Sequence, residues 1–240
     1  MWLDVVDLRD FYASPLGRVT RRMILRELRR DWPDTSGQTV VGLGFATPYL
    51  SPFRMDGARV IAAMPASQGV LHWPADSPGQ TILTDEIELP LPDLSVDRLI
   101  MVHALESAEQ VRPLMREIWR VLAGNGRLMV IVPNRRGIWA RLERTPFGNG
   151  RPYSTGQLTR LLRDSMFTPI STSAALYMPP GRSRMLLHSA NAWEKLGQRW
   201  FKAVGGVVMI EASKQIYAAT PGLEVARKRR RVVIKNQEAS

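Results

Sequence analysis

The 240-residue sequence contains no cysteine, and this absence excludes disulfide bonds, thiolate metal sites and a cysteine nucleophile. Histidine is scarce: only His72, His103 and His188 occur, and no two have the close helical spacing of metal ligands, so we expect no metal site. No apolar run approaches the roughly 18 residues that a membrane-spanning helix requires. The first residues include Asp4 and Asp7 where a signal peptide would be basic, so we expect a cytoplasmic protein.

The formal net charge is +11, and its sources are clustered. One arginine-rich cluster spans residues 17–32 and another spans residues 226–235. Two interpretations stay open. The clusters are solvated faces whose arginine stems cover apolar surface, or they attract nucleic acid or other anions.

The order of the apolar segments predicts an α/β protein. Two helices fill residues 4–32 and are broken at Ser14 and Pro15, after which short apolar strands alternate with helices. The expected strands cover residues 39–44, 58–64, 80–85, 96–104 and 126–133. Their continuous apolar runs indicate a doubly wound, Rossmann-like sheet that is mostly parallel and covered on both faces. Such sheets bind ligands at the carboxyl ends of their strands.

Two helices between these strands have recognisable ends. We expect one over residues 108–122, capped by the sequence AGNG at residues 123–126. Another begins after Ser154, which forms a capping box with Gln157.

The last third of the chain has a different pattern. Residues 182–200 are expected to be helical, and residues 205–219 are expected to contain a strand. Five apolar residues recur at helical spacing, and we expect the two tryptophans among them to lie in the core. These residues are Leu186, Ala190, Trp193, Leu196 and Trp200. We expect one domain over residues 1–221, with residues 1–36 as a helical lid, and a flexible basic tail over residues 222–240.

The residues around the third to fifth expected strands resemble class I S-adenosylmethionine-dependent methyltransferases, in particular the type 11 branch that includes quinone-biosynthesis enzymes. The matching residues before the fourth strand are Asp85, Leu89, Pro90, Leu91, Asp93, Ser95, Val96 and Asp97. Those before the fifth strand are Arg120, Val121, Leu122, Gly126 and Leu128. The resemblance runs from about residue 11 to residue 165. It implies a methyltransferase enzyme with S-adenosylmethionine as cofactor, and a seven-stranded sheet whose last strand is antiparallel.

The glycine-rich loop departs from the family pattern V-L-[DE]-x-G-x-G-x-G. Gly42 stands at the acidic position, Gly44 keeps the first glycine, and Ala46 and Pro48 replace the next two. Proline in the first turn of a helix removes only a spare donor, so we expect the loop to keep its shape. Met64 stands where the family has the acid that binds the ribose. Each lost charge-assisted bond is worth about 1.5–3 kcal/mol, so we predict cofactor binding in a weakened or rearranged form.

The resemblance also implies candidate site residues. The cofactor-binding candidates are Gly42, Leu43, Gly44, Phe45, Met64, Asp85, Glu86 and His103, with Asp85 accepting from the adenine amino group. His103 is the candidate catalytic base, and the alternative is a histidine that only shapes the pocket. Tyr12, Trp139 and Arg135 are candidates for binding the methyl acceptor.

The sequence leaves the acceptor and the oligomeric state open. The long segment over residues 133–154 is basic and aromatic, which suits an anionic acceptor, although a solvated lid explains it equally well. We predict methyl transfer to a small-molecule acceptor. The alternative is an inactive methyltransferase fold that serves as a scaffold, or that binds RNA or another anion through its basic clusters.

Overall fold

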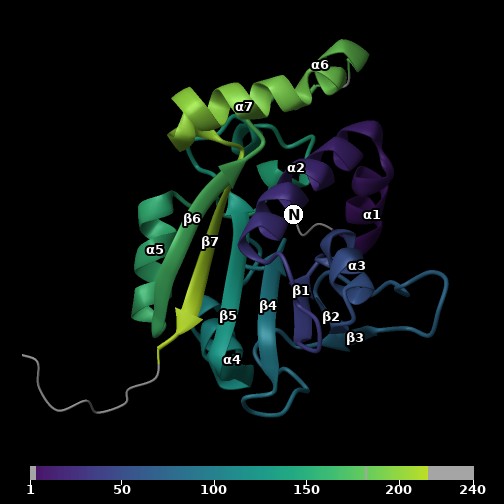
Figure 1. Cartoon of the computed structure of the whole chain (residues 1–240), viewed down its shortest axis with the longest axis vertical. Helices are drawn as coiled ribbons and strands as arrows, with labels where there is room; N and C mark the ends of the chain where they lie inside the picture. The colour runs from purple at the N-terminus through teal and green to yellow at the C-terminus, as the bar shows by residue number, and fades with distance from the viewer. Residues whose placement is uncertain (1–3, 182, 216–240) are drawn as a thin grey trace, which may run out of the picture.

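The computed structural model describes residues 4–181 and 183–215, so the expected tail and its basic cluster lie outside the described residues. Seven strands form one sheet in the order β3-β2-β1-β4-β5-β7-β6 (Figure 1). The strands are β1 Thr39–Gly44, β2 Arg59–Pro65, β3 Thr81–Thr84, β4 Val96–Val102, β5 Leu122–Pro133, β6 Phe167–Ala175 and β7 Val207–Lys214. The helices are α1 Val5–Ala13, α2 Pro15–Asp31, α3 Thr47–Met55, α4 Val111–Val121, α5 Thr155–Asp164, α6 Arg184–His188 and α7 Ala190–Trp200. Short 3₁₀ turns are η1 Trp139–Arg141, η2 Pro146–Gly148 and η3 Lys202–Val204.

The sheet confirms the predicted fold class. β3, β2, β1, β4 and β5 are parallel to their neighbours, and β7 pairs antiparallel with both β5 and β6. The strand order reverses between β1 and β4: β2 and β3 follow β1 toward one edge of the sheet, and β5 follows β4 toward the other edge. This reversal is the point where doubly wound sheets leave a crevice at the carboxyl ends of the strands.

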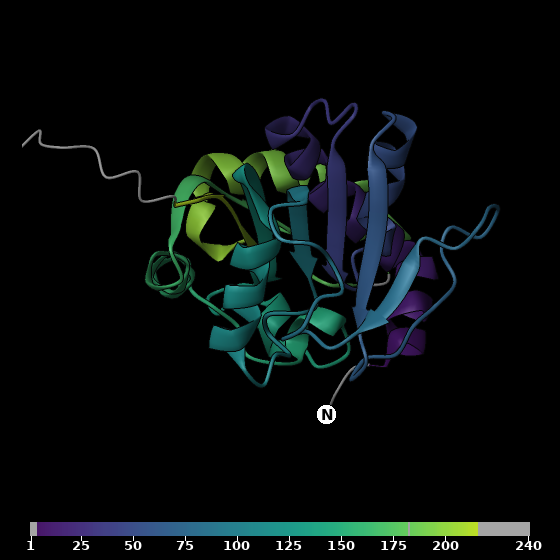
Figure 2. The same cartoon turned by 90° about the horizontal axis from the view of Figure 1, so that it is seen from below.

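Helices cover both faces of the sheet, and each strand residue packs on the face that alternation dictates. On one face α1, α2 and α3 pack against Val40, Val60 and Ile100. On the other face α4 and α5 pack against Val41 and Leu99. Figures 1 and 2 show these two layers, with no helix between β2 and β3. The segment between β2 and β3 instead contacts the start of α1, where the Val5 N–H donates to the Gln68 carbonyl oxygen.

The family-like residues before β4 and β5 hold each other in place. The Arg120 guanidinium donates to the backbone oxygens of Leu89 and Leu91, each at 2.9 Å, and it also pairs with Glu117 and Asp93. The second sequence match therefore clamps the loop that carries the first one. This part of the resemblance is structural, since Arg120 fixes Leu89 and Leu91 at the entry into β4.

Two local predictions need correction. The long helix begins at Val111, and residues 123–126 belong to β5 instead of capping the helix, because Leu122 is already extended (φ −67°, ψ 134°). The apolar stripe of the last third is core only in part, because Ala190 is buried whereas Leu196 and both tryptophans are exposed. Trp193 and Trp200 are exposed on α7, because small residues on another face of that helix make its contact with the body.

Other boundaries are confirmed. α1 and α2 meet at Ser14, whose hydroxyl caps α2, and Pro15 is the first residue of that helix. The capping box of Ser154 and Gln157 is formed at the start of α5.

Candidate functional site

The candidate site lies at the carboxyl ends of β1, β2 and β4. Three chain segments meet there: the loop after β1 at residues 45–46, the segment after β2 at residues 66–71, and the segment after β4 at residues 103–106. These neighbouring strands end at the same edge of the sheet. The arrangement places most of the cofactor residues predicted from the sequence in one region.

The loop after β1 keeps the sharp turn that the sequence predicts. Gly44 has φ +81°, and a Cβ added there would lie 2.3 Å from the Val102 carbonyl oxygen and 2.8 Å from the Ala104 Cβ. Only glycine fits where the two strand ends approach so closely. Pro48 lies in the first turn of α3, where its missing N–H has no intrahelical partner to lose. The prediction that the loop keeps its shape is therefore confirmed.

The acidic position of the loop is filled by packing. A Cβ added to Gly42 would lie 2.7 Å from the Ala46 Cβ and 2.8 Å from the Leu50 side chain. A carboxylate at this position would have to displace both. The absence of the acid is thus part of how α3 packs on β1.

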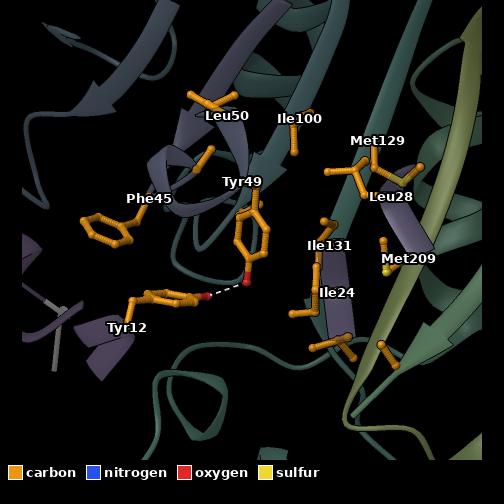
Figure 3. Packing of buried hydrophobic residues seen from close by; sticks show 14 of the residues in the cluster. Tyr12, Ile24, Leu28, Phe45, Tyr49, Leu50, Ile100, Met129, Ile131 and Met209 are labelled. Atoms are coloured by element: carbon orange, nitrogen blue, oxygen red, sulfur yellow. Dashed lines mark hydrogen bonds between the residues drawn. The ribbon is translucent and has the colours of Figure 1, made fainter. Parts of the chain in front are cut away.

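Phe45 and Met64 occupy space inside the crevice. Met64 is 1% exposed, and its sulfur accepts the Leu71 backbone N–H at 3.4 Å. The Phe45 ring stacks on the Tyr12 ring with centroids 5.8 Å apart and planes inclined by 22° (Figure 3). Two positions that the resemblance assigns to the cofactor are therefore packed against this chain's own side chains.

Tyr12 comes from α1 and closes the crevice from above the strand ends. Its hydroxyl lies 2.9 Å from the Tyr49 hydroxyl and 2.8 Å from Nε2 of His103. Figure 3 shows the Tyr12 and Tyr49 hydroxyls pointing toward each other. Burial raises the pKa of Tyr12 well above its ordinary value, and Tyr49 raises it further. Burial likewise raises the pKa of Tyr49, so both hydroxyls stay protonated at neutral pH. We call Tyr12, Phe45, Tyr49 and His103 the Tyr12 cluster.

His103 follows β4 directly and has an unusual backbone. Its φ of +54° is in the left-handed region, which non-glycine residues adopt at a cost. Nδ1 of its ring lies 3.3 Å from Oε1 of Glu106, and the Phe147 ring lies against it with centroids 4.9 Å apart. The Glu106 carboxylate is buried, and neither of its oxygens has a hydrogen-bond partner among the described residues. The His103 ring therefore has Tyr12 next to Nε2 and the buried Glu106 next to Nδ1.

The segment after β2 closes the crevice together with α1. The Val5 N–H donates to the Gln68 carbonyl oxygen at 2.8 Å, and the Gln68 side-chain amide donates to the His103 carbonyl oxygen. Gln68 is buried. The start of α1, the segment after β2 and the segment after β4 are thus tied together by hydrogen bonds.

One end of the site remains open. A cavity of about 250 Å³ is lined by residues that follow β2 and β3 and by the approach to α4. Its acidic residues include Asp85, which is exposed, and Glu86, which is half-buried. Burial raises the pKa of Glu86, and the neighbouring charge of Asp85 adds to this effect. The two acids predicted from the sequence therefore lie in the open part of the site.

The predicted acceptor-binding residues lie in different surroundings. Tyr12 is at the centre of the crevice, whereas Trp139 is fully buried and donates its indole N–H to the Met178 carbonyl oxygen at 2.8 Å. Trp139 still connects to the site, because its ring packs edge-on against Phe147. Arg135 is exposed just after β5 and makes no side-chain contact with the Tyr12 cluster. In the described part of the chain, no three acidic or histidine side chains are grouped to hold a metal ion.

Sequence reasoning missed several residues of this site. Glu106, Tyr49, Gln68 and Phe147 all contact the Tyr12 cluster or His103. Glu106 alone carried a signal, since it is an acid three residues after a histidine at a strand end. The others come from segments whose path the sequence did not reveal.

Comparison with known proteins agrees with this geometry. Residues 40–130, which include Gly44, Met64 and His103, match the family model described as a methyltransferase domain. A probable S-adenosylmethionine-dependent methyltransferase of Mycobacterium tuberculosis is 33% identical over 106 residues, which cover 43% of this chain and 38% of that protein. The chain spans less than two thirds of the length of the curated relatives it matches.

Solved structures share the fold at low identity. An S-adenosylmethionine-dependent methyltransferase of Thermotoga maritima, described as a possible histamine N-methyltransferase, aligns with a TM-score of 0.62 at 18% identity, covering 88% of this chain and 96% of that one. The geranyl diphosphate C-methyltransferase of Streptomyces coelicolor, crystallised with S-adenosylhomocysteine, aligns with a TM-score of 0.54 at 16% identity, covering 79% of each chain. Residues 40–130 thus match a methyltransferase domain, and the chain shares its fold with S-adenosylmethionine-dependent methyltransferases.

The methyltransferases that this chain resembles use S-adenosylmethionine, and the candidate site is open only in part in the conformation described. The open cavity at Asp85 and Glu86 lies where the resemblance places the adenine. The positions that the resemblance assigns to the sugar and the sulfonium include Met64 and Phe45, which are buried, and the Phe45 ring is stacked against Tyr12.

Proposed function

We propose that this chain transfers a methyl group from S-adenosylmethionine to a small-molecule acceptor, and that its donor crevice is closed in the conformation described. The observation that carries the proposal is Gly44. Its φ of +81° and its close approach to Val102 preserve the turn at the carboxyl end of β1, inside the segment that matches the methyltransferase domain.

Opening the crevice requires α1 to move with the segment after β2. The contacts that hold it closed include the two hydrogen bonds of the Tyr12 hydroxyl, the stacking of Tyr12 on Phe45 and the bonds of Gln68. The apolar side chains of α1, Val5 and Leu8, are also buried in the core. Each neutral hydrogen bond has a net worth of about 0.5–1.5 kcal/mol. A ligand that binds only the open form can offset contacts of this size, at the expense of apparent affinity.

Opening would also expose His103. When Tyr12 withdraws, Nε2 loses its partner and faces the crevice, while Glu106 remains next to Nδ1 and holds the ring. A histidine supported in this way can take a proton from an oxygen or nitrogen nucleophile. We assign His103 as the base and Glu106 as a positioning residue. The exposed Arg135 follows β5, and its charge suits an acceptor with negative charge.

The test of this function is donor binding followed by turnover. Calorimetry and thermal shift with S-adenosylmethionine and S-adenosylhomocysteine should give saturable binding with the full chain, at weaker affinity than a crevice with both acids would provide. A screen of small acceptors with isotope-labelled donor should then give labelled product. If millimolar ligand gave neither heat in calorimetry nor a thermal shift, the proposed methyltransferase activity would be excluded.

The filled crevice favours a second candidate, an inactive scaffold that binds an anion through its basic clusters. The supporting observation is that Met64 and Phe45 are packed as core residues. Nucleic-acid binding of this kind weakens steeply as salt rises, and it should disappear when residues 222–240 are deleted. Methyl transfer to a small molecule should be indifferent to that deletion.

A further inference from the structure

The outer surface of α7 and the turn after it carries large apolar side chains that the fold does not cover. Trp200 is 67% exposed, Phe201 57% and Trp193 40%, and Leu196 and Val204 are also exposed. We call these five residues the α7 patch. None of the helices in the described residues has the length and apolar character of a membrane span.

The way α7 is seated explains why this patch faces outward. The buried residues of the helix are Ala190, Glu194 and Gly197. A Cβ added to Gly197 would lie 2.1 Å from the Tyr177 ring, so the helix contacts the body through its small residues. At about 100° per residue, Trp193 and Trp200 lie roughly a quarter of the circumference away from that contact. The tryptophans are therefore turned away from the core by the register of the helix.

The charges around the α7 patch have one sign. Residues 181–206 include five lysines and arginines and a single acid, Glu194. Glu194 is buried, and it accepts the Tyr177 N–H at 2.8 Å. Lys195 and Arg199 are exposed on the same helix, and the Arg199 guanidinium lies 5.9 Å from the centre of the Trp200 ring. The exposed surface of α7 thus combines aromatic residues with the positive charges of Lys195 and Arg199.

We propose that the α7 patch binds the surface of an anionic phospholipid bilayer. Indole rings favour the region between lipid headgroups and acyl chains, and nearby lysine and arginine side chains attract anionic headgroups. The core of a protein interface is instead depleted in lysine. In Figure 1, α6 and α7 lie across one end of the molecule, beyond the sheet. The strands β1, β2 and β4 end on this side too, so the patch and the crevice share one edge of the sheet.

The experiment is flotation of the full chain with vesicles of phosphatidylcholine alone or mixed with phosphatidylglycerol. We expect association with the mixed vesicles and association weaker by about ten-fold or more with phosphatidylcholine alone. The double variant Trp193→Ser/Trp200→Ser should lose most of the binding, by about ten-fold or more. Its matched control is Met55→Ser/Leu83→Ser, which removes two exposed apolar side chains elsewhere and should bind as the unaltered chain does. Circular dichroism and thermal unfolding should show that both variants remain folded.

Three results would overturn the proposal. The first is normal flotation of the tryptophan variant together with its loss on deletion of residues 222–240, which would assign binding to the basic tail. The second is a dimer in light scattering that becomes a monomer in the tryptophan variant, which would make a second copy the occupant. The third is no association with either vesicle. Since none of these measurements reads methyl transfer, failure of the proposed function would leave the result unchanged.

Discussion

The Tyr12 hydroxyl lies 2.8 Å from Nε2 of His103, although the two residues are 91 positions apart in the chain. This contact joins α1 to the end of β4 across the crevice where we propose that the methyl donor binds. The crevice therefore cannot open at this point unless the hydrogen bonds of the Tyr12 hydroxyl break.

Replacing Tyr12 with phenylalanine should tighten donor binding. Tyr12→Phe removes both hydrogen bonds of the hydroxyl but keeps the ring on Phe45, so the closed form loses about 1–3 kcal/mol that the open form never had. We expect the apparent Kd for S-adenosylhomocysteine to fall by about ten-fold in calorimetry. Phe167→Leu, a core change on the opposite face of the sheet, is the matched control and should leave that Kd unchanged. An unchanged or weaker affinity in Tyr12→Phe would show that the contact does not oppose binding.

Replacing His103 with asparagine should remove turnover and spare donor binding. Asparagine tolerates the left-handed backbone of this position, so His103→Asn tests the ring without adding strain. Loss of a general base lowers the rate by about 10²- to 10⁴-fold. We expect a fall of that size in kcat, with the Kd of the donor changed little except through the lost bond to Tyr12. Full turnover in this variant would leave His103 with a shaping role only.

Glu194 should make stability depend on pH. Burial raises its pKa to about 7 in the folded chain, well above the value of an exposed glutamate. Because the folded pKa is the higher one, the contribution of this group is fully present below about pH 4.5 and is lost as pH rises through about 7. The total change is at most about 3 kcal/mol.

The variant that checks this is Glu194→Gln, which keeps an oxygen to accept the Tyr177 N–H. Its free energy of unfolding in urea should vary less between pH 5 and pH 7.5 than that of the unaltered chain, and should exceed it at pH 8. Parallel pH curves for the two chains would contradict the assignment.

Arg120 should matter for stability and not for the chemistry. Arg120→Ala removes the bonds to Leu89, Leu91 and two carboxylates, and we expect a loss of about 2 kcal/mol in denaturant unfolding. Arg116→Ala on the same helix changes an exposed arginine with no such partners in the described structure, and its effect should be within about 0.5 kcal/mol. Equal effects of the two variants would remove the structural role of the clamp.

The sequence allowed the sheet and its crevice to be predicted because parallel buried strands are continuous apolar runs. It did not reveal β6, because Phe167–Ala175 contain four threonines and serines and many of these residues are only half-buried or exposed. Nor did it reveal the closure of the crevice. Whether Met64 binds a ligand or packs in the core depends on where α1 and the segment after β2 lie, and no local pattern fixes either.

The exposed tryptophans of α7 are a second case in which the sequence pattern did not determine burial. Trp193 and Trp200 have the helical spacing of a core stripe, and the prediction that they are buried was wrong. What decides the outcome is Gly197, because it allows the helix to rest against Tyr177 by a different face. The pattern of apolar residues does not reveal this contact, because it depends on the missing side chain of Gly197.

The most direct test of the account is amide hydrogen exchange of the full chain with and without saturating S-adenosylhomocysteine. If the crevice opens to admit the donor, exchange should rise in residues 5–13 and 66–71, where Val5 and Gln68 hold the closure, and should fall around Asp85 and Glu86. Unchanged exchange in all of these segments at millimolar ligand would contradict the claim that this crevice binds an adenosyl donor.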